Sequence, residues 1–394
     1  MSVGIQSAGS DRVVHGTVAK GYEGVRAVFE QVVADDYNEP GAQLAAYADG
    51  RQVVDLWAGD DIAGDTLHAV FSNTKGAAHV VVAMLVEDGV LDLDRRVAEY
   101  WPEFAAHGKA RLTLRQLLQH RSGVIGVDGG FSTAELADDR VVAARLADQK
   151  PFWEPGESYG YHAYVIGALT GEVVRRVTGS SIQELFEERI RAPFGLDFYI
   201  GLPEEQEARY VPVRPMDPPP QLAAQLAANP IPPDSALGIA FNLNATPPTD
   251  LAAFINERSV RALGPTSAGG IGNARGLARF YAAVIGGLDG APALLSPDTI
   301  AEFSRLGTPG VDAVTGDVDH FGLGFETVAL RYPFLGAAAF GHSGAAGSQA
   351  FADPTSGIAY GYTRRRFHFP PGGGATENDA LAAAVVRAAK AESA

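Results

Sequence analysis

The chain has 394 residues, of which 46% are hydrophobic and 20% charged, with a formal net charge of −16 at pH 7. A chain of this length exceeds the usual size of one compact core, so we expect two lobes or one large α/β unit. Such an acidic surface repels phosphate backbones and argues against a nucleic-acid partner. Because cysteine is absent, disulfides, thiolate zinc sites and cysteine nucleophiles are excluded.

The location of the protein is predicted from what its sequence lacks. Residues 1–16 do not combine a basic region with an apolar stretch, as a signal peptide would. No segment contains the roughly 18 uninterrupted apolar residues of a membrane span. We therefore expect a cytoplasmic protein with no membrane partner, while its oligomeric state stays open.

The first part of the chain predicts a helix and then a hairpin. Residues 21–35 carry apolar positions at helical spacing. Residues 43–58 are typical of two strands joined by a turn at Asp49 and Gly50.

Helical patterns dominate the middle of the chain. Residues 72–88 predict a helix that is apolar on most of its surface, so we expect it to be buried. Further helical patterns cover residues 112–118 and 164–178. The proline-rich stretch 203–249 predicts long loops with short helical pieces, and such loops often line a site.

The last part of the chain changes in character. A glycine-rich run, 269–272, precedes a predicted helix over 275–286, and a final helix is expected over 378–391. Strand-like runs joined by Gly, Ser and Pro turns lie between them, at 337–341, 348–352 and 357–363.

These elements predict an α+β fold. Strands at both ends of the chain would form one antiparallel sheet flanked by the terminal helices, with a mainly helical lobe inserted. We assign residues 1–88 and 265–394 to the sheet domain and 89–264 to the helical domain with its proline-rich loops. A site is expected in the cleft between the two.

Ser72 and Lys75 form a Ser-x-x-Lys motif at the start of the predicted buried helix. Positions i and i+3 share a helix face, so the amine would lie near the hydroxyl. A serine needs a base at neutral pH, and a lysine can serve where burial lowers its pKa. The N-terminus of the helix also offers free N–H groups to a developing oxyanion.

Two further stretches contain candidate site residues. In the first, Tyr161 follows a Pro-Gly turn by five residues, and Trp153 and Tyr159 lie nearby, either as walls of an apolar pocket or as core. The second is Gly341-His342-Ser343-Gly344-Ala345-Ala346-Gly347, at the end of a predicted strand. On its own it could also be a glycine-rich turn.

In this order, the three motifs resemble the serine β-lactamase and penicillin-binding-protein superfamily, closest to its family VIII carboxylesterases. The resemblance implies that Ser72 is acylated, with Lys75 and Tyr161 as its proton-transfer partners. It also implies that Lys75 lowers the pKa of Tyr161. The backbone N–H groups of Ser72 and Ala345 would form the oxyanion hole.

The same resemblance places His342, Ser343 and Gly344 at the substrate. Two departures from the pattern favour esters over β-lactams. Ala163 stands where β-lactamases hold an asparagine that contacts the substrate amide. His342 replaces a lysine, so a fixed positive charge for a substrate carboxylate is missing. His120 is expected to brace a loop and not to act as a base.

Two cofactor-binding motifs of other enzyme classes are absent. The chain has no phosphate-binding Gly-x-x-x-x-Gly-Lys loop and no His-Glu-x-x-His pair. We therefore expect neither a metal nor another cofactor.

The sequence thus predicts a carboxylesterase that cleaves small, short-acyl esters through an acyl-enzyme. An amidase or weak β-lactamase, or an acyltransferase, on the same serine stays open. A non-catalytic binding protein that kept the fold is the alternative from another class. Whether Lys75 or Tyr161 is the general base is not decided by the sequence.

Overall fold

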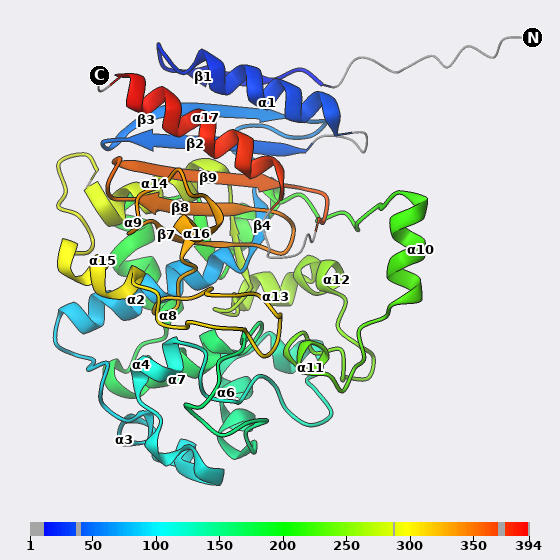
Figure 1. The fold of residues 1–394 in the computed structure, drawn as a ribbon, viewed down its shortest axis with the longest axis vertical. Coiled ribbons are helices and arrows are strands. Elements are labelled where there is room, and N and C mark those ends of the chain that lie inside the picture. The colour runs from blue at the N-terminus through cyan, green and yellow to red at the C-terminus, as the bar shows by residue number, and fades with distance from the viewer. Residues whose placement is uncertain (1–11, 37–40, 287, 369–374, 393–394) are drawn as a thin grey trace, which may run out of the picture.

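The computed structural model describes residues 12–36, 41–286, 288–368 and 375–392. Residues 1–11, which make up most of the stretch considered above as a leader, lie outside these ranges. The described chain forms a layered part built on a sheet and a mainly helical part beside it (Figure 1). No helix among the described residues has the length and apolar character needed to cross a membrane.

The main sheet joins the two ends of the chain, as the sequence predicts. It has six antiparallel strands in the order β1-β3-β2-β9-β8-β7. Its central pair aligns Ala42 with Arg364 and Ala48 with Ile358. The strands are β1 (His15–Val18), β2 (Ala42–Ala48), β3 (Arg51–Ala58), β7 (Phe340–Ser343), β8 (Gln349–Asp353) and β9 (Ile358–Arg364).

The predicted hairpin of β2 and β3 is confirmed. Its turn residues have positive φ angles, 49° at Asp49 and 75° at Gly50, as tight two-residue hairpins require. Strand β7 begins later than expected, because Gly336 to Ala339 form a turn in which the Ala339 N–H donates to the Gly336 carbonyl.

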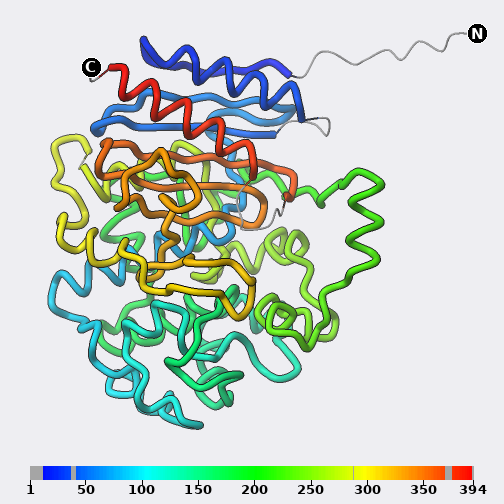
Figure 2. The backbone as a smooth tube through the Cα atoms, viewed as in Figure 1, coloured from blue at the N-terminus to red at the C-terminus, as the bar shows by residue number. Residues whose placement is uncertain are grey.

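Helices cover both faces of this sheet, which is why its central strands carry no polar face. Helices α1 (Glu23–Asp35) and α17 (Glu377–Glu392) pack together over one face, and the tube trace shows these first and last helices side by side (Figure 2). Helix α14 (Ala274–Gly286) packs on the other face. A Cβ at Gly361 of β9 would come within 2.5 Å of the Ala274 carbonyl, so only glycine lets α14 lie this close.

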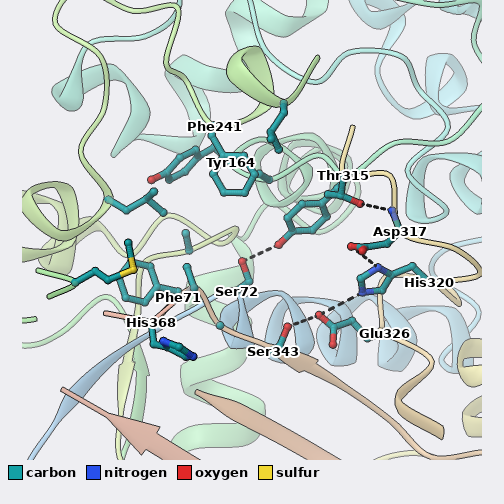
Figure 3. A pocket seen from close by; sticks show the side chains of 18 of the residues that line it. Phe71, Ser72, Tyr164, Phe241, Thr315, Asp317, His320, Glu326, Ser343 and His368 are labelled. Carbon is teal, nitrogen blue, oxygen red and sulfur yellow. Dashed lines mark hydrogen bonds and ion pairs between the residues drawn. The ribbon is translucent and has the colours of Figure 1, made fainter. Parts of the chain in front are cut away.

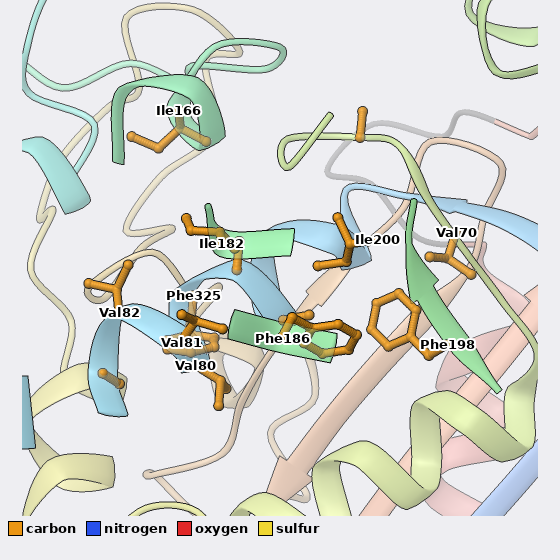
Figure 4. Close-up of a cluster of buried hydrophobic side chains, with 14 of the residues drawn as sticks. Val70, Val80, Val81, Val82, Ile166, Ile182, Phe186, Phe198, Ile200 and Phe325 are labelled. Carbon is orange, nitrogen blue, oxygen red and sulfur yellow. The ribbon is translucent and has the colours of Figure 1, made fainter. Parts of the chain in front are cut away.

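Helix α2 (Asn73–Glu87) runs through the centre of the molecule and is buried over nearly its whole length. Its valines at positions 80–82 pack in a cluster with Phe186 and Phe325 (Figure 4). Fully burying a side chain of this kind contributes about 1.5–3 kcal/mol. The first turn of α2 is therefore held firmly in place.

A second, three-stranded sheet was not predicted. It has the order β4-β6-β5, from β4 (His68–Phe71), β6 (Gly270–Gly272) and β5 (Phe198–Ile200). The glycine-rich run is thus a strand and not only an approach to α14. Strand β5 lies within the segment assigned to the helical lobe, so that segment also contributes to a sheet.

The remaining helices are short and mostly belong to the helical part. The stretch 203–249 has the predicted loops and short helices. In chain order the helices are α3 (Val97–Tyr100), α4 (Leu114–Leu118), α5 (Thr133–Leu136), α6 (Asp139–Asp148), α7 (Ile166–Thr178), α8 (Ile182–Phe186), α9 (Ala192–Phe194), α10 (Pro220–Ala228), α11 (Ala236–Ala240), α12 (Leu251–Asn256), α13 (Arg258–Leu263), α15 (Pro297–Ser304) and α16 (Val328–Arg331), with 3₁₀ segments at Pro102–Arg111 and Glu204–Arg209 and a π-helical turn at Glu187–Arg191.

Candidate active site

Ser72 occupies a sharp turn between β4 and α2. Phe71, just before it, is buried and has a φ of 46°, a left-handed conformation that costs an aromatic residue about 1–3 kcal/mol. Thr74 stabilises the turn, because its hydroxyl donates to the Phe71 carbonyl and accepts from the Gly270 N–H at 2.8 Å. A Cβ at Gly270 would lie 2.5 Å from that hydroxyl oxygen, which explains the glycine.

The Lys75 amine is fully buried and has three oxygen neighbours. Its Nζ atom lies 3.0 Å from Ser72 Oγ, 2.7 Å from the Ala163 carbonyl and 2.8 Å from the Ser267 carbonyl. Both carbonyls belong to the backbone, so no side-chain pattern could have revealed them.

Burial lowers the pKa of Lys75 well below its usual 10.5, although the charge of Glu326 acts in the opposite direction. A neutral amine has two N–H groups and one lone pair. When the two N–H groups bond the Ala163 and Ser267 carbonyls, the lone pair faces the Ser72 hydroxyl. In this state Lys75 can accept the serine proton.

Tyr161 contacts the same serine from another side, and its hydroxyl donates to Ser72 Oγ at 2.7 Å. Its ring stacks on Phe321 with centroids 5.6 Å apart, and Lys75 Nζ lies 4.8 Å from its centre. Burial raises the pKa of Tyr161 above its usual 10, and the charge of Glu326 adds to this. The net shift is thus upward and not downward, because desolvation outweighs any lowering of this pKa by Lys75.

The loop that carries Tyr161 is fixed through its backbone. The Tyr161 N–H donates to Asp312 Oδ1 at 3.1 Å, and the His162 N–H donates to His120 Nδ1 at 3.1 Å. His120 is fully buried, and burial holds its pKa well below the usual range. His120 is thus placed as a neutral brace of this loop.

Ser72 and Ala345 both line the cavity that contains the nucleophile. Within the described part of the chain, the backbone N–H of neither residue donates to another group. A clasp joins the turns that carry them: Asn73 Nδ2 donates to the Ser348 hydroxyl at 2.9 Å and to the Val70 carbonyl at 3.1 Å. These bonds hold the turn before α2 against the turn after β7.

A cavity of about 590 Å³ contains Ser72. Figure 3 shows Ser72 between the rings of Tyr164 and Phe241 on one side and Glu326 with His320 on the other. The apolar part of the wall consists of Phe71, Ala163, Tyr164, Met216, Leu222, Leu226, Leu237, Phe241, Leu251, Ala268 and Phe321.

The cavity has a polar wall, of which sequence reasoning named only Ser343. The Ser343 hydroxyl donates to Glu326 Oε1 at 2.6 Å, and His320 lies between Glu326, at 3.8 Å, and Asp317, at 3.4 Å. These two carboxylates raise the pKa of His320 to about 9 against the effect of burial, so its ring is charged at neutral pH. None of the sequence motifs contains Asp317, His320 or Glu326, so no signal in the sequence pointed to them.

Several predicted substrate contacts lie elsewhere. His342 does not border the cavity, because neighbours on a strand point to opposite faces and Ser343 takes the cavity side. Burial lowers the pKa of His342 to about 4, so it is neutral. The Tyr159 hydroxyl donates to the Gly310 carbonyl at 2.6 Å and the Trp153 indole to the Ser158 carbonyl at 3.2 Å, and neither side chain borders the cavity.

Gly344 lines the cavity, as expected, and lies against the nucleophile turn. A Cβ there would come within 2.4 Å of the Val70 carbonyl and 2.2 Å of Ser348 Oγ. Among the described residues, no group of three or more His, Asp or Glu side chains is arranged to hold a metal ion. The groups that meet at Ser72 are its own hydroxyl, the buried Lys75 amine and the Tyr161 phenol.

The chain matches a family model and a curated relative. The family model described as "Beta-lactamase" matches residues 25–384. Esterase/beta-lactamase LipL of Mycobacterium tuberculosis (strain ATCC 25618 / H37Rv) is 32% identical over 351 residues, which cover 84% of this chain and 78% of that protein.

Solved structures give the same result. EstA of Arthrobacter nitroguajacolicus Rue61a is 40% identical, with a TM-score of 0.88 over 96% of this chain and 99% of that one. A family VIII carboxylesterase is 35% identical, with a TM-score of 0.83 over 95% of this chain and all (100%) of that one. The resemblance and the fold class inferred from the sequence are confirmed: the chain belongs to the beta-lactamase family.

Proposed function

We propose that this protein is a serine carboxylesterase, with Ser72 as the nucleophile that forms an acyl-enzyme. The observation that carries the proposal is the position of Ser72 Oγ, 3.0 Å from Lys75 Nζ and 2.7 Å from the Tyr161 hydroxyl, in a largely apolar cavity. The esterase and carboxylesterase names of the similar proteins support the same activity.

Acylation begins when Ser72 Oγ attacks the carbonyl carbon of the ester and its proton passes to the neutral Lys75 amine. The N–H groups of Ser72 and Ala345 stabilise the oxyanion of the tetrahedral intermediate. The Tyr161 hydroxyl, which stays protonated, donates its proton to the departing alkoxide, and Lys75 restores it. The carbon–oxygen bond to the alcohol breaks and the acyl group remains on Ser72.

Deacylation repeats these steps with water. A water molecule attacks the acyl carbonyl and gives up a proton to the Lys75 and Tyr161 pair. The bond to Ser72 Oγ then breaks, the serine regains a proton and the carboxylic acid leaves. Each proton transfer of this kind contributes about 10²–10⁴-fold to the rate.

The charges of the cavity support esters over β-lactams. The described residues that line it include no lysine or arginine, and the one cationic side chain, His320, already pairs with Asp317 and Glu326. A substrate carboxylate such as that of a penicillin therefore finds no free positive charge. Ala163 adds a methyl group where an amide-binding side chain would be needed.

The test compares kcat/KM for p-nitrophenyl butyrate and for a chromogenic cephalosporin, in the parent and in Ser72→Ala. We expect the ester to be hydrolysed far faster than the cephalosporin, and Ser72→Ala to lose at least about 10³-fold on the ester. Faster cephalosporin turnover would favour a β-lactamase. Ester hydrolysis that survives in Ser72→Ala would contradict the assignment of the nucleophile.

The cytoplasmic location and the division of the chain into lobes at residues 88 and 264 stay predictions from the sequence.

A further inference from the structure

We propose that the substrates are esters with an extended apolar group, and that helix α10 provides the wall against which this group packs. The inference rests on the proposed esterase function and goes beyond the short-acyl preference expected from the sequence. It concerns an apolar subsite in the Ser72 cavity, filled by either the acyl chain or the alcohol of the ester.

Helix α10 has apolar side chains with little protein around them. Leu222 and Leu226, one turn apart, both border the cavity, and they are 41% and 45% exposed. No residue of α10 is buried, and Figure 1 shows the helix at the edge of the molecule. The surrounding segment, 218–233, carries no charged residue in a chain with a net charge of −16. Because both leucines border the Ser72 cavity, we take this uncovered apolar face as part of its binding surface.

Other side chains that line the cavity are apolar like the α10 face. They include Tyr164, Phe241, Leu251 and Met216. Cavities of about 300–1,000 Å³ bury most of the surface of drug-sized ligands, and this one has about 590 Å³. A short acyl ester would leave Leu222 and Leu226 in water, whereas a longer apolar group would cover them.

The apolar subsite belongs to the same cavity as Ser72, so we infer that the group that fills it is part of the substrate. Ser72 lies between the aromatic wall and the polar wall of Ser343, Glu326 and His320 (Figure 3). With the ester carbonyl at Ser72, the apolar part of the substrate extends toward α10, because the opposite direction leads to buried charges. The polar wall thus sets the orientation and the α10 wall sets the preference for length.

The experiment measures kcat/KM along two series: p-nitrophenyl acetate to octanoate varies the acyl chain, and ethyl to octyl acetate varies the alcohol. We expect kcat/KM to rise in one series by roughly three-fold per methylene that reaches the subsite. The responding series identifies whether the acyl chain or the alcohol occupies it.

The double variant Leu222→Ala/Leu226→Ala should lose about ten-fold or more on the longest substrate and less than about two-fold on the shortest, since each truncation removes apolar contact area. Leu263→Ala is the matched control, because Leu263 is 48% exposed and borders none of these walls. It should follow the parent. A profile that does not rise in either series, or that rises equally in the double variant, overturns the inference while ester hydrolysis itself persists. A parent that hydrolyses no ester at all overturns the proposed function and the inference with it.

Discussion

Lys75 has a defined proton-accepting geometry because two backbone carbonyls take its N–H groups. The amine is fully buried between the Ala163 and Ser267 carbonyls, and only Ser72 Oγ remains for its lone pair. Tyr161 has the complementary role, since burial keeps its hydroxyl protonated and able to donate. The sequence leaves the general base open, and the mechanism that we propose assigns this role to Lys75.

This division of roles predicts the pH dependence of kcat/KM. Burial lowers the pKa of Lys75, and only the neutral amine can accept a proton, so activity should be low on the acid side and rise through that lowered pKa to a plateau. The pKa of Tyr161 is raised, so the plateau should extend beyond pH 10. The measurement is the pH profile of p-nitrophenyl butyrate hydrolysis. A decline that begins below about pH 9 would mean that Tyr161 loses its proton more easily than a free tyrosine, whose pKa is about 10, and would contradict this prediction.

At this scale the sequence predicted the side chains that meet at Ser72 but not their surroundings. The Ser-x-x-Lys spacing predicts proximity, because i and i+3 share a helix face, and the structure places the two atoms 3.0 Å apart. Glu326 and His320 could not be predicted, since only the tertiary fold brings their loops to the cavity. His342 was assigned to the substrate without its strand register, which directs it into the core.

Among the elements, the junction of β7 and α2 holds the two turns whose N–H groups we propose as oxyanion donors. Asn73 and Ser348 join the turn before α2 to the turn after β7. Gly344 lies where those turns meet, and no side chain fits there.

The sequence did not predict the second sheet, because its strand β6 is short and rich in glycine and resembles a loop in sequence.

Gly344→Ala should therefore reduce kcat while the protein still folds. The new Cβ would come within 2.4 Å of the Val70 carbonyl, which moves the Ala345 N–H away from the oxyanion. Loss of one such donor costs about 10²–10³-fold in kcat.

Gly24→Ala in α1 is the matched control, because a Cβ there meets nothing within 4 Å. We expect it to keep the parent kcat and KM. Unchanged kcat in Gly344→Ala, with a folded state shown by circular dichroism, would contradict the position assigned to the second oxyanion donor.

In the whole molecule, the first and last parts of the chain pack together beside the site. Strand β2 pairs with β9, and helices α1 and α17 pack together, so the first and last parts of the chain share one core. Helix α2 and its neighbours form a second core on the site side of the sheet. The sequence predicted this organisation because hairpin and helix signals were strong at both ends. It did not predict how β5 connects the inserted segment to the sheet region, since such pairing depends on the tertiary fold.

The central claim is that this chain carries one activated serine, Ser72. The most direct measurement is intact-mass spectrometry after exposure to a fluorophosphonate, on the parent and on Ser72→Ala. Our mechanism predicts a single adduct on the parent and none on the variant, because Lys75 and Tyr161 activate no other hydroxyl. No adduct on the parent, or one that persists in Ser72→Ala, would contradict the mechanism and favour a binding protein that kept the fold.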